Sequence, residues 1–135
     1  VAESISAKAA ALIAAFWPGA LSLLFPAKHS VHVPLRGIGD KVCVRCPSSD
    51  VARALCDRFG GAVTSTSANR TGSAPARSLD ELEVEGIAVA IDAGPLRSSP
   101  PSTIYDPDSE RFIREGPVRR EQIEAALQAC ERQNQ

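Results

Sequence analysis

Prolines and glycines divide this chain of 135 residues into short segments, and the division limits the folds that the chain can adopt. Pro26 and Pro47 each follow a short apolar run, and Gly60-Gly61 follows a segment with helical spacing. Proline removes a backbone donor and glycine permits a chain reversal, so no long helix is expected across these positions. Apolar residues recur both at helical spacing and in short runs. This pattern predicts a mixed α/β fold with crossover and hairpin connections.

The expected elements follow these segments in chain order. Helices are predicted at about 6–16, from Ser48 or Ser49 to about 59, from Ser78 over a short distance and at about 120–130. Strands are predicted at 21–25, 41–46, 62–66, 87–92, 102–105 and 111–114. We expect one domain over residues 1–130 and a frayed polar tail at 131–135.

Two of the four cysteines, Cys43 and Cys46, have the spacing of zinc and redox sites. They lie in a predicted strand, where residues three apart point to opposite faces. Two thiols so placed cannot easily bind one ion or form a disulfide. We therefore expect buried free thiols and no zinc, and four reduced cysteines fit a cytoplasmic protein.

Composition argues against a membrane-spanning protein and against a protein whose overall charge attracts nucleic acid. No apolar run approaches the roughly 20 residues of a membrane span. The formal net charge of −1 provides no general attraction for nucleic acid, so any RNA contact would need a local basic patch.

Candidate site residues gather where predicted strands end. The stretch 64–72 contains hydroxyls and one amide, which suit a polar ligand, although a solvated loop is the alternative. Arg45 and Arg114 each end a strand, and Ser102-Thr103 opens another. Ligands of open α/β sheets bind beside strand ends, and guanidinium groups match phosphate and carboxylate. An anionic ligand is predicted from this joint placement, although each arginine alone could be an ordinary surface residue.

The chain contains six short sequence blocks, each present once: FWPGALSL at 16–23, VRCP at 44–47, TSANRTG at 66–72, DAGP at 92–95, PSTIYD at 101–106 and IREGP at 113–117. In this order they resemble the YrdC-like threonylcarbamoyl-AMP synthases. The resemblance implies a twisted, open mixed sheet with a concave ligand cavity. It also implies an enzyme that condenses L-threonine, bicarbonate and ATP, with Mg²⁺ on the ATP, into threonylcarbamoyl-AMP and pyrophosphate.

The resemblance further implies roles for individual residues. The implied contacts are Arg45, Ser65, Thr66 and Ser102 for threonine, and Ser67, Asn69, Thr103 and Arg114 for ATP. No nucleophile or general base is implied, because this chemistry depends on positioning and charge stabilisation. The product would pass to tRNA threonylcarbamoyl-transfer proteins for modification of an adenosine in tRNA.

The family's PTET-like block and K-x-R segment have no counterpart in residues 1–15. We therefore expect the first part of the domain to be missing and the 135 residues alone to be inactive. One alternative is a module that binds double-stranded RNA or tRNA through the arginines Arg70, Arg111, Arg114, Arg119 and Arg120. Another is a carbamoyl-transfer domain of the hydrogenase-maturation type, which ranks lower because the zinc-finger and acylphosphatase-like regions of those proteins are absent here.

Overall fold

The structure is a computed structural model that describes residues 1–37 and 39–133. The chain forms two compact units. The first unit comprises Val1–Ala54 and Pro100–Gln135, and the second comprises Leu55–Ser99.

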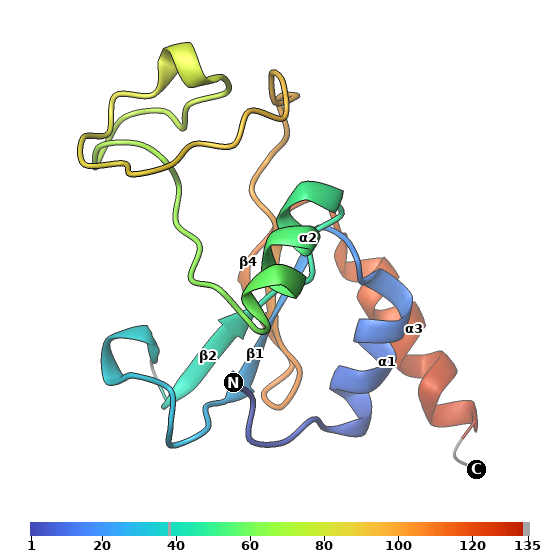
Figure 1. Ribbon diagram of the computed structural model, residues 1–135. Coiled ribbons are helices and arrows are strands. Elements are labelled where there is room, and N and C mark those ends of the chain that lie inside the picture. Colours follow the sequence, from blue (N-terminus) through green and yellow to red (C-terminus); the bar gives the residue numbers. More distant parts are fainter. Residues whose placement is uncertain (38, 134–135) are drawn as a thin grey trace. The chain divides into compact units, whose positions relative to one another are not determined.

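The first unit contains an open four-stranded mixed sheet (Figure 1). Its strands are β1 (Leu21–Pro26), β2 (Lys41–Val44), β3 (Thr103–Asp106) and β4 (Arg111–Arg114), in the order β2-β1-β3-β4. The central pair, β1 and β3, is parallel, and both outer pairs are antiparallel. The predicted α/β class with a mixed open sheet is therefore confirmed.

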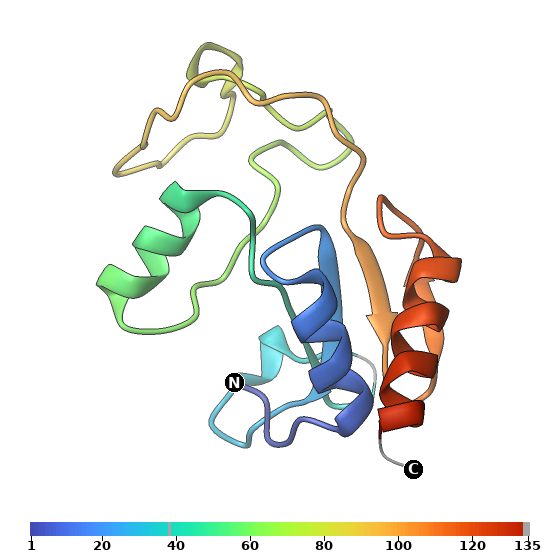
Figure 2. The same ribbon diagram turned by 90° about the vertical axis from the view of Figure 1, so that its right-hand side faces the viewer.

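Two helices, α1 (Ala7–Phe16) and α3 (Arg120–Gln133), lie side by side in the first unit (Figure 2). Side chains of β1 and β3 pack with them into one core, whose buried residues are Ala9, Leu12, Leu21, Leu23, Phe25, Tyr105, Val118, Ile123 and Leu127. Alternation along β1 sends Leu21, Leu23 and Phe25 to this core. Full burial of such a side chain contributes about 1.5–3 kcal/mol, so this core holds α1 and α3 against the sheet.

A serine side chain caps the first turn of two helices, whereas Ser78, which was expected to begin a helix, makes no side-chain cap hydrogen bond before Leu79–Glu81. Ser6 precedes α1, and its hydroxyl oxygen accepts a hydrogen bond from the Ala9 backbone N–H at 3.3 Å. Ser49 precedes α2 (Asp50–Phe59), and its hydroxyl oxygen accepts one from the Ala52 N–H, also at 3.3 Å. Helix α3 continues through residues 131–133, where a frayed tail was predicted. Asn134 and Gln135, the rest of that predicted tail, lie outside the described residues.

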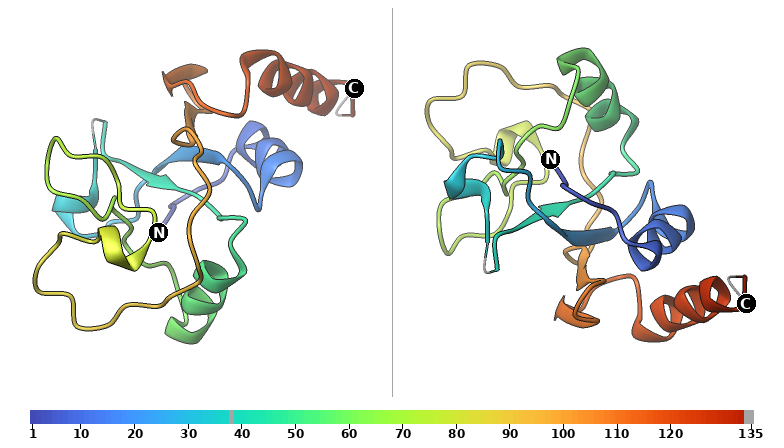
Figure 3. Two further views of the ribbon diagram at one scale, coloured as in Figure 1. Left: turned by 90° about the horizontal axis from the view of Figure 1, so that it is seen from above. Right: turned by 90° about the horizontal axis from the view of Figure 1, so that it is seen from below.

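The second unit lacks both of its predicted strands. Residues 62–66 and 87–92 are irregular, so these two predictions are wrong. The only helical turn within 60–99 is the 3₁₀ helix Leu79–Glu81, and the rest is drawn as a plain tube (Figure 3). Hydrophobic spacing alone does not make a strand, because the backbone groups also need a partner strand. No residue of 55–99 is buried, which fits the absence of a sheet there.

Among the residues that the structure describes, no helix combines the length and apolar character needed to cross a membrane.

Candidate active site

One face of the first unit's sheet carries a cluster of polar side chains. Ser22 alternates along β1 with the core residues Leu21 and Leu23, so its side chain lies on the face opposite the core. Cys43 pairs with Leu24 across β1 and β2, and Arg114 pairs with Ile104 across β3 and β4. Leu24 lies two residues after Ser22 on β1, and Ile104 pairs with Ser22 across β1 and β3. The side chains of Cys43 and Arg114 therefore lie on the same face of the sheet as Ser22.

Hydrogen bonds join three of these residues. The hydroxyl oxygens of Ser22 and Ser102 lie 2.9 Å apart. The Arg114 guanidinium donates from Nε to the Ser102 carbonyl oxygen at 2.9 Å and from Nη2 to the Ser102 hydroxyl oxygen at 3.2 Å. These contacts use two of the five N–H donors of the exposed guanidinium. The remaining donors are available to an anion, so the structure brings Ser102 and Arg114 together as the sequence suggested.

Cys43 and Arg45 extend the cluster at β2. Although the Cys43 residue is exposed by surface area, neighbouring protein atoms partly desolvate its thiol and raise its pKa above the usual value, while Arg114, the Ser22 hydroxyl and Arg45 each lower it. The thiol is therefore protonated at neutral pH. Arg45 follows the last residue of β2, one position beyond the Leu23–Val44 pair. Its guanidinium is exposed and makes no hydrogen bond with another described residue.

The cysteines differ from the expectation of buried thiols. None of these four described residues forms a disulfide, but Cys43 is exposed and the other three are half-buried. The edge strand β2 is only partly covered, since each of its residues is half-buried or exposed. The described residues include no group of three or more His, Cys, Asp or Glu side chains arranged to hold a metal ion.

Thr103 lies on the core side of β3 and is fully buried. Its hydroxyl donates to the Val118 carbonyl oxygen at 2.8 Å and accepts from the Val118 N–H at 3.1 Å. These two bonds fix the start of β3 to the segment before α3. Contact with ATP stays a prediction for Thr103, whereas its neighbour Ser102 occupies the polar face.

The other predicted ligand residues, Ser65, Thr66, Ser67 and Asn69, belong to the second unit. The Asn69 side-chain amide donates to the carbonyl oxygens of Arg70 at 3.0 Å and Ser73 at 2.8 Å, and so closes a turn. Its side-chain oxygen is buried without a hydrogen-bond partner among the described residues. Asn69 also lines a cavity of about 410 Å³. The hydroxyls of Ser65, Thr66 and Ser67 are exposed.

The arginines proposed for RNA binding do not form one free set of cations. Arg70 belongs to the second unit and pairs with Glu85 at 3.5 Å. Arg120 pairs with Glu115 at 3.2 Å, and Arg114 is held by Ser102. RNA binding stays a prediction.

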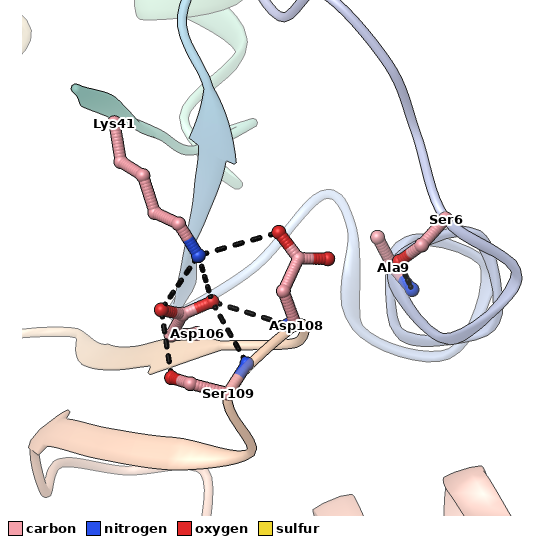
Figure 4. Close-up of polar contacts among 6 residues, drawn as sticks. All are labelled: Ser6, Ala9, Lys41, Asp106, Asp108 and Ser109. Atoms are coloured by element: carbon pink, nitrogen blue, oxygen red, sulfur yellow. Dashed lines mark hydrogen bonds and ion pairs between the residues drawn. The ribbon is translucent and has the colours of Figure 1, made fainter. Parts of the chain in front are cut away.

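A buried ion pair, which the sequence did not reveal, fixes the end of the sheet away from Ser102 (Figure 4). The Lys41 ammonium donates to both Asp106 carboxylate oxygens at 2.7 and 2.8 Å and to Asp108 at 3.3 Å. Burial alone would raise the pKa of Asp106, but hydrogen bonds from Lys41, Ser109 and the backbone hold it below its usual value. Burial also opposes the charge of Lys41, and the bonds to both aspartates raise its pKa nonetheless. The pair ties β2 to the turn between β3 and β4.

Sequence reasoning missed Ser22 and Cys43 as parts of the polar cluster. One signal was present: Ser22 interrupts the apolar run of 21–25 at an alternate position, where a strand exposes its second face. The Trp17-Pro18-Gly19 block connects α1 to β1 and makes two contacts that hold this connection. Trp17 donates from its indole nitrogen to the Leu21 carbonyl oxygen at 2.7 Å, and the Gly19 N–H donates to the Cys46 carbonyl oxygen at 2.8 Å.

Comparisons with known proteins identify the family and support the fold. The family model Sua5_yciO_yrdC, described as telomere recombination, matches residues 1–116. A threonylcarbamoyl-AMP synthase of Alkalilimnicola ehrlichii is 41% identical over 108 residues, which cover 76% of this chain and 57% of the relative. One from Chromobacterium violaceum is 34% identical over 114 residues, or 83% of this chain and 59% of the relative. The chain thus spans a little over half the length of these relatives.

Among solved structures, P. abyssi Sua5 complexed with L-threonine superimposes with a TM-score of 0.83 at 29% identity. The match covers 93% of this chain and 38% of that protein. A variant of the same protein superimposes with a TM-score of 0.81. Because the family model matches most of its residues, the chain belongs to the Sua5/YciO/YrdC family.

Proposed function

We propose that this protein provides the threonine- and nucleotide-binding residues of a threonylcarbamoyl-AMP synthase. The observation that carries the proposal is the joined pair Ser102 and Arg114, which presents a hydroxyl and free guanidinium donors on an open sheet face. The names of the curated relatives support the reaction. The bound L-threonine of the P. abyssi structure supports the amino-acid substrate.

The reaction needs few protein groups that change covalently. Bicarbonate takes up a proton and releases water to give carbon dioxide, and the threonine amine then adds to its carbon and loses a proton, which leaves a carbamate. A carbamate oxygen then attacks the α-phosphate of ATP, and the bond to the leaving pyrophosphate breaks. The enzyme's task is to position these anions and to stabilise the charge that shifts onto pyrophosphate.

Residues of the first unit match this task. In the proposal, Arg114 binds an ATP phosphate through the N–H groups that Ser102 does not use. Arg45 binds the threonine carboxylate with its exposed guanidinium. The Ser102 hydroxyl faces threonine or the adenylate, and Thr103 supports that segment from the core side.

The second unit supplies the remaining contacts in this proposal. Ser65 and Thr66 contact threonine, and Ser67 and Asn69 contact ATP. The unpartnered Asn69 side-chain oxygen supports such a contact, because a ligand N–H or O–H would satisfy it. Mg²⁺ enters with ATP and is held by phosphate and water, a common arrangement for this ion. The product would then serve tRNA modification through threonylcarbamoyl-transfer proteins.

The test follows backbone N–H signals by NMR while L-threonine is added to the chain, and measures pyrophosphate release with ATP, L-threonine and bicarbonate. We expect L-threonine to shift the signals of Ser102, Thr103 and Arg114. Arg114→Ala should weaken ATP binding at least tenfold, because it removes charged hydrogen bonds to phosphate. Arg111→Ala is the matched control on the same strand, with about twofold change or less.

Threonine binding with threonine-dependent pyrophosphate release would support the complete reaction. Threonine binding without release would limit the protein to the binding role. Absence of any threonine-dependent shift on the polar face would contradict the proposal.

A further inference from the structure

Ser22 is a buried hydroxyl that lies directly behind the ligand-facing residue Ser102. It is 6% exposed, so it has little access to a ligand itself. Its hydroxyl oxygen lies 2.9 Å from that of Ser102. On its other side it interacts with the Cys43 thiol from the neighbouring strand. Cys43, Ser22 and Ser102 therefore form a row from β2 across β1 to the start of β3 on the polar face.

The direction of the hydrogen bond between Ser22 and Ser102 decides whether the Ser102 hydroxyl can donate its proton to a ligand. A hydroxyl has one proton to donate and two lone pairs to accept. Arg114 only donates, so it occupies one lone pair of the Ser102 oxygen. If Ser22 donates to the other lone pair, the Ser102 proton is free for a ligand. If Ser102 donates to Ser22 instead, no proton remains for the ligand.

The Cys43 thiol beside Ser22 favours donation from the Ser22 hydroxyl to the Ser102 oxygen. The thiol of Cys43 is protonated at neutral pH, since partial desolvation by its neighbours raises its pKa. A protonated thiol is a weak donor and a weak acceptor, whereas the Ser102 oxygen is a good acceptor. Ser22 therefore gains more by donating to Ser102 and accepting from Cys43 than by the reverse arrangement.

We propose that Ser22, supported by Cys43, is a positioning residue that holds the Ser102 hydroxyl with its proton toward the ligand. The inference rests on the proposed threonine and ATP binding at this face. The recipient is an anionic oxygen, of the threonine carboxylate or of a phosphate, because a donated proton and the Arg114 charge then act on the same group. Ser22 and Cys43 act through Ser102 and do not touch the substrate.

The test measures the Kd of L-threonine and of ATP by calorimetry for wild type, Ser22→Ala, Cys43→Ala and Cys43→Ser. Ser22→Ala should raise the Kd of the ligand that Ser102 contacts by about two- to tenfold, the loss typical of one neutral hydrogen bond. Cys43→Ala should have a smaller effect in the same direction. Cys43→Ser should restore binding, because its hydroxyl is a donor in the same place. A purely structural role in filling space would not separate Ser from Ala at this exposed position.

Cys46→Ala is the matched thiol control and should leave both Kd values unchanged, since among the described residues Cys46 makes its hydrogen bond through its backbone oxygen, which accepts from the Gly19 N–H. The thermal unfolding midpoint of each variant shows whether the fold is retained. If wild type binds and Ser22→Ala binds equally well, or if Cys43→Ser behaves like Cys43→Ala, the inference is wrong while the proposed function stands. If wild type binds neither ligand, the proposed function fails and the inference fails with it.

Discussion

The two units contain similar short apolar runs but form different structures. In the first unit, residues 21–26 form β1, which pairs with β2 on one side and β3 on the other. In the second unit, residues 87–92 have comparable β-forming residues, yet Ile87, Val89 and Ile91 are exposed and no strand forms. The difference teaches that a strand depends on the backbone partners and core that surround it more than on its own residues.

The same difference affects the proposed ligand residues. In the first unit, strand register sets which side chains share a face, and hydrogen bonds fix Ser102 and Arg114 against each other. In the second unit, Ser65 and Ser67 are exposed loop residues, and only Asn69 is fixed, by its turn. The proposed ligand residues of the first unit are therefore preorganised, whereas the hydroxyls of the second unit are not.

The largest expected contrast is in side-chain truncation. Ile123→Ala removes a fully buried side chain from the core of the first unit and should cost about 2–5 kcal/mol of unfolding free energy. Leu96→Ala in the second unit truncates a side chain that is 63% exposed. This substitution should change the unfolding free energy by no more than about 0.5 kcal/mol. Urea denaturation of both variants provides the measurement. Equal losses would show that the second unit also has a core, and the comparison would not hold.

The sequence predicts most elements of the first unit because their signals are local. A helical apolar face, a serine cap and a closing proline or glycine are all readable at 6–16, 21–25 and 120–130. The missing strands at 62–66 and 87–92 depend on pairing with distant residues, which no local pattern reveals. The end of α3 was also missed, because residues 131–133 are polar but continue a helix that packs on α1.

The candidate site was predictable in part for the same reason. Arginines and hydroxyls at strand ends drew attention to Ser102 and Arg114. The contact of Ser22 with Ser102 joins residues 80 positions apart and requires the parallel pairing of β1 and β3. The Lys41–Asp106 pair likewise joins residues 65 positions apart. Such contacts follow from topology, which the sequence pattern did not specify.

A glycine substitution tests backbone packing in the two units. A Cβ at Gly116 would lie 2.4 Å from the Pro101 carbonyl oxygen and 2.6 Å from the Thr103 nitrogen. Gly116→Ala should therefore displace the segment that carries Ser102 and cost about 1–3 kcal/mol, as overpacking does. In the second unit, Gly61→Ala meets nothing within 4 Å and should be nearly neutral. Thermal unfolding, with NMR signals of Ser102 and Arg114, compares the two variants; an unperturbed Ser102 in Gly116→Ala would contradict this packing.

The smallest expected contrast is between the ion pairs of the two units. Lys41 and Asp106 have side chains only 18% and 10% exposed, whereas Arg70 and Glu85 are 65% and 92% exposed. Asp106→Asn should cost about 1 kcal/mol at neutral pH because the half-buried ammonium of Lys41 loses one of its two carboxylate acceptors and keeps only Asp108. Glu85→Gln should have no measurable effect, since exposed pairs contribute little.

The stabilisation by the Lys41–Asp106 pair should depend on pH in a defined direction. The pKa of Asp106 is lower in the folded protein than its usual value, so ionised Asp106 stabilises the fold above about pH 4. That contribution disappears as the pH falls through the lowered pKa of the folded state. The difference in unfolding free energy between wild type and Asp106→Asn should therefore shrink on acidification, whereas Glu85→Gln should follow wild type throughout. A difference that stays constant to low pH would mean that Asp106 contributes through packing and not through its charge.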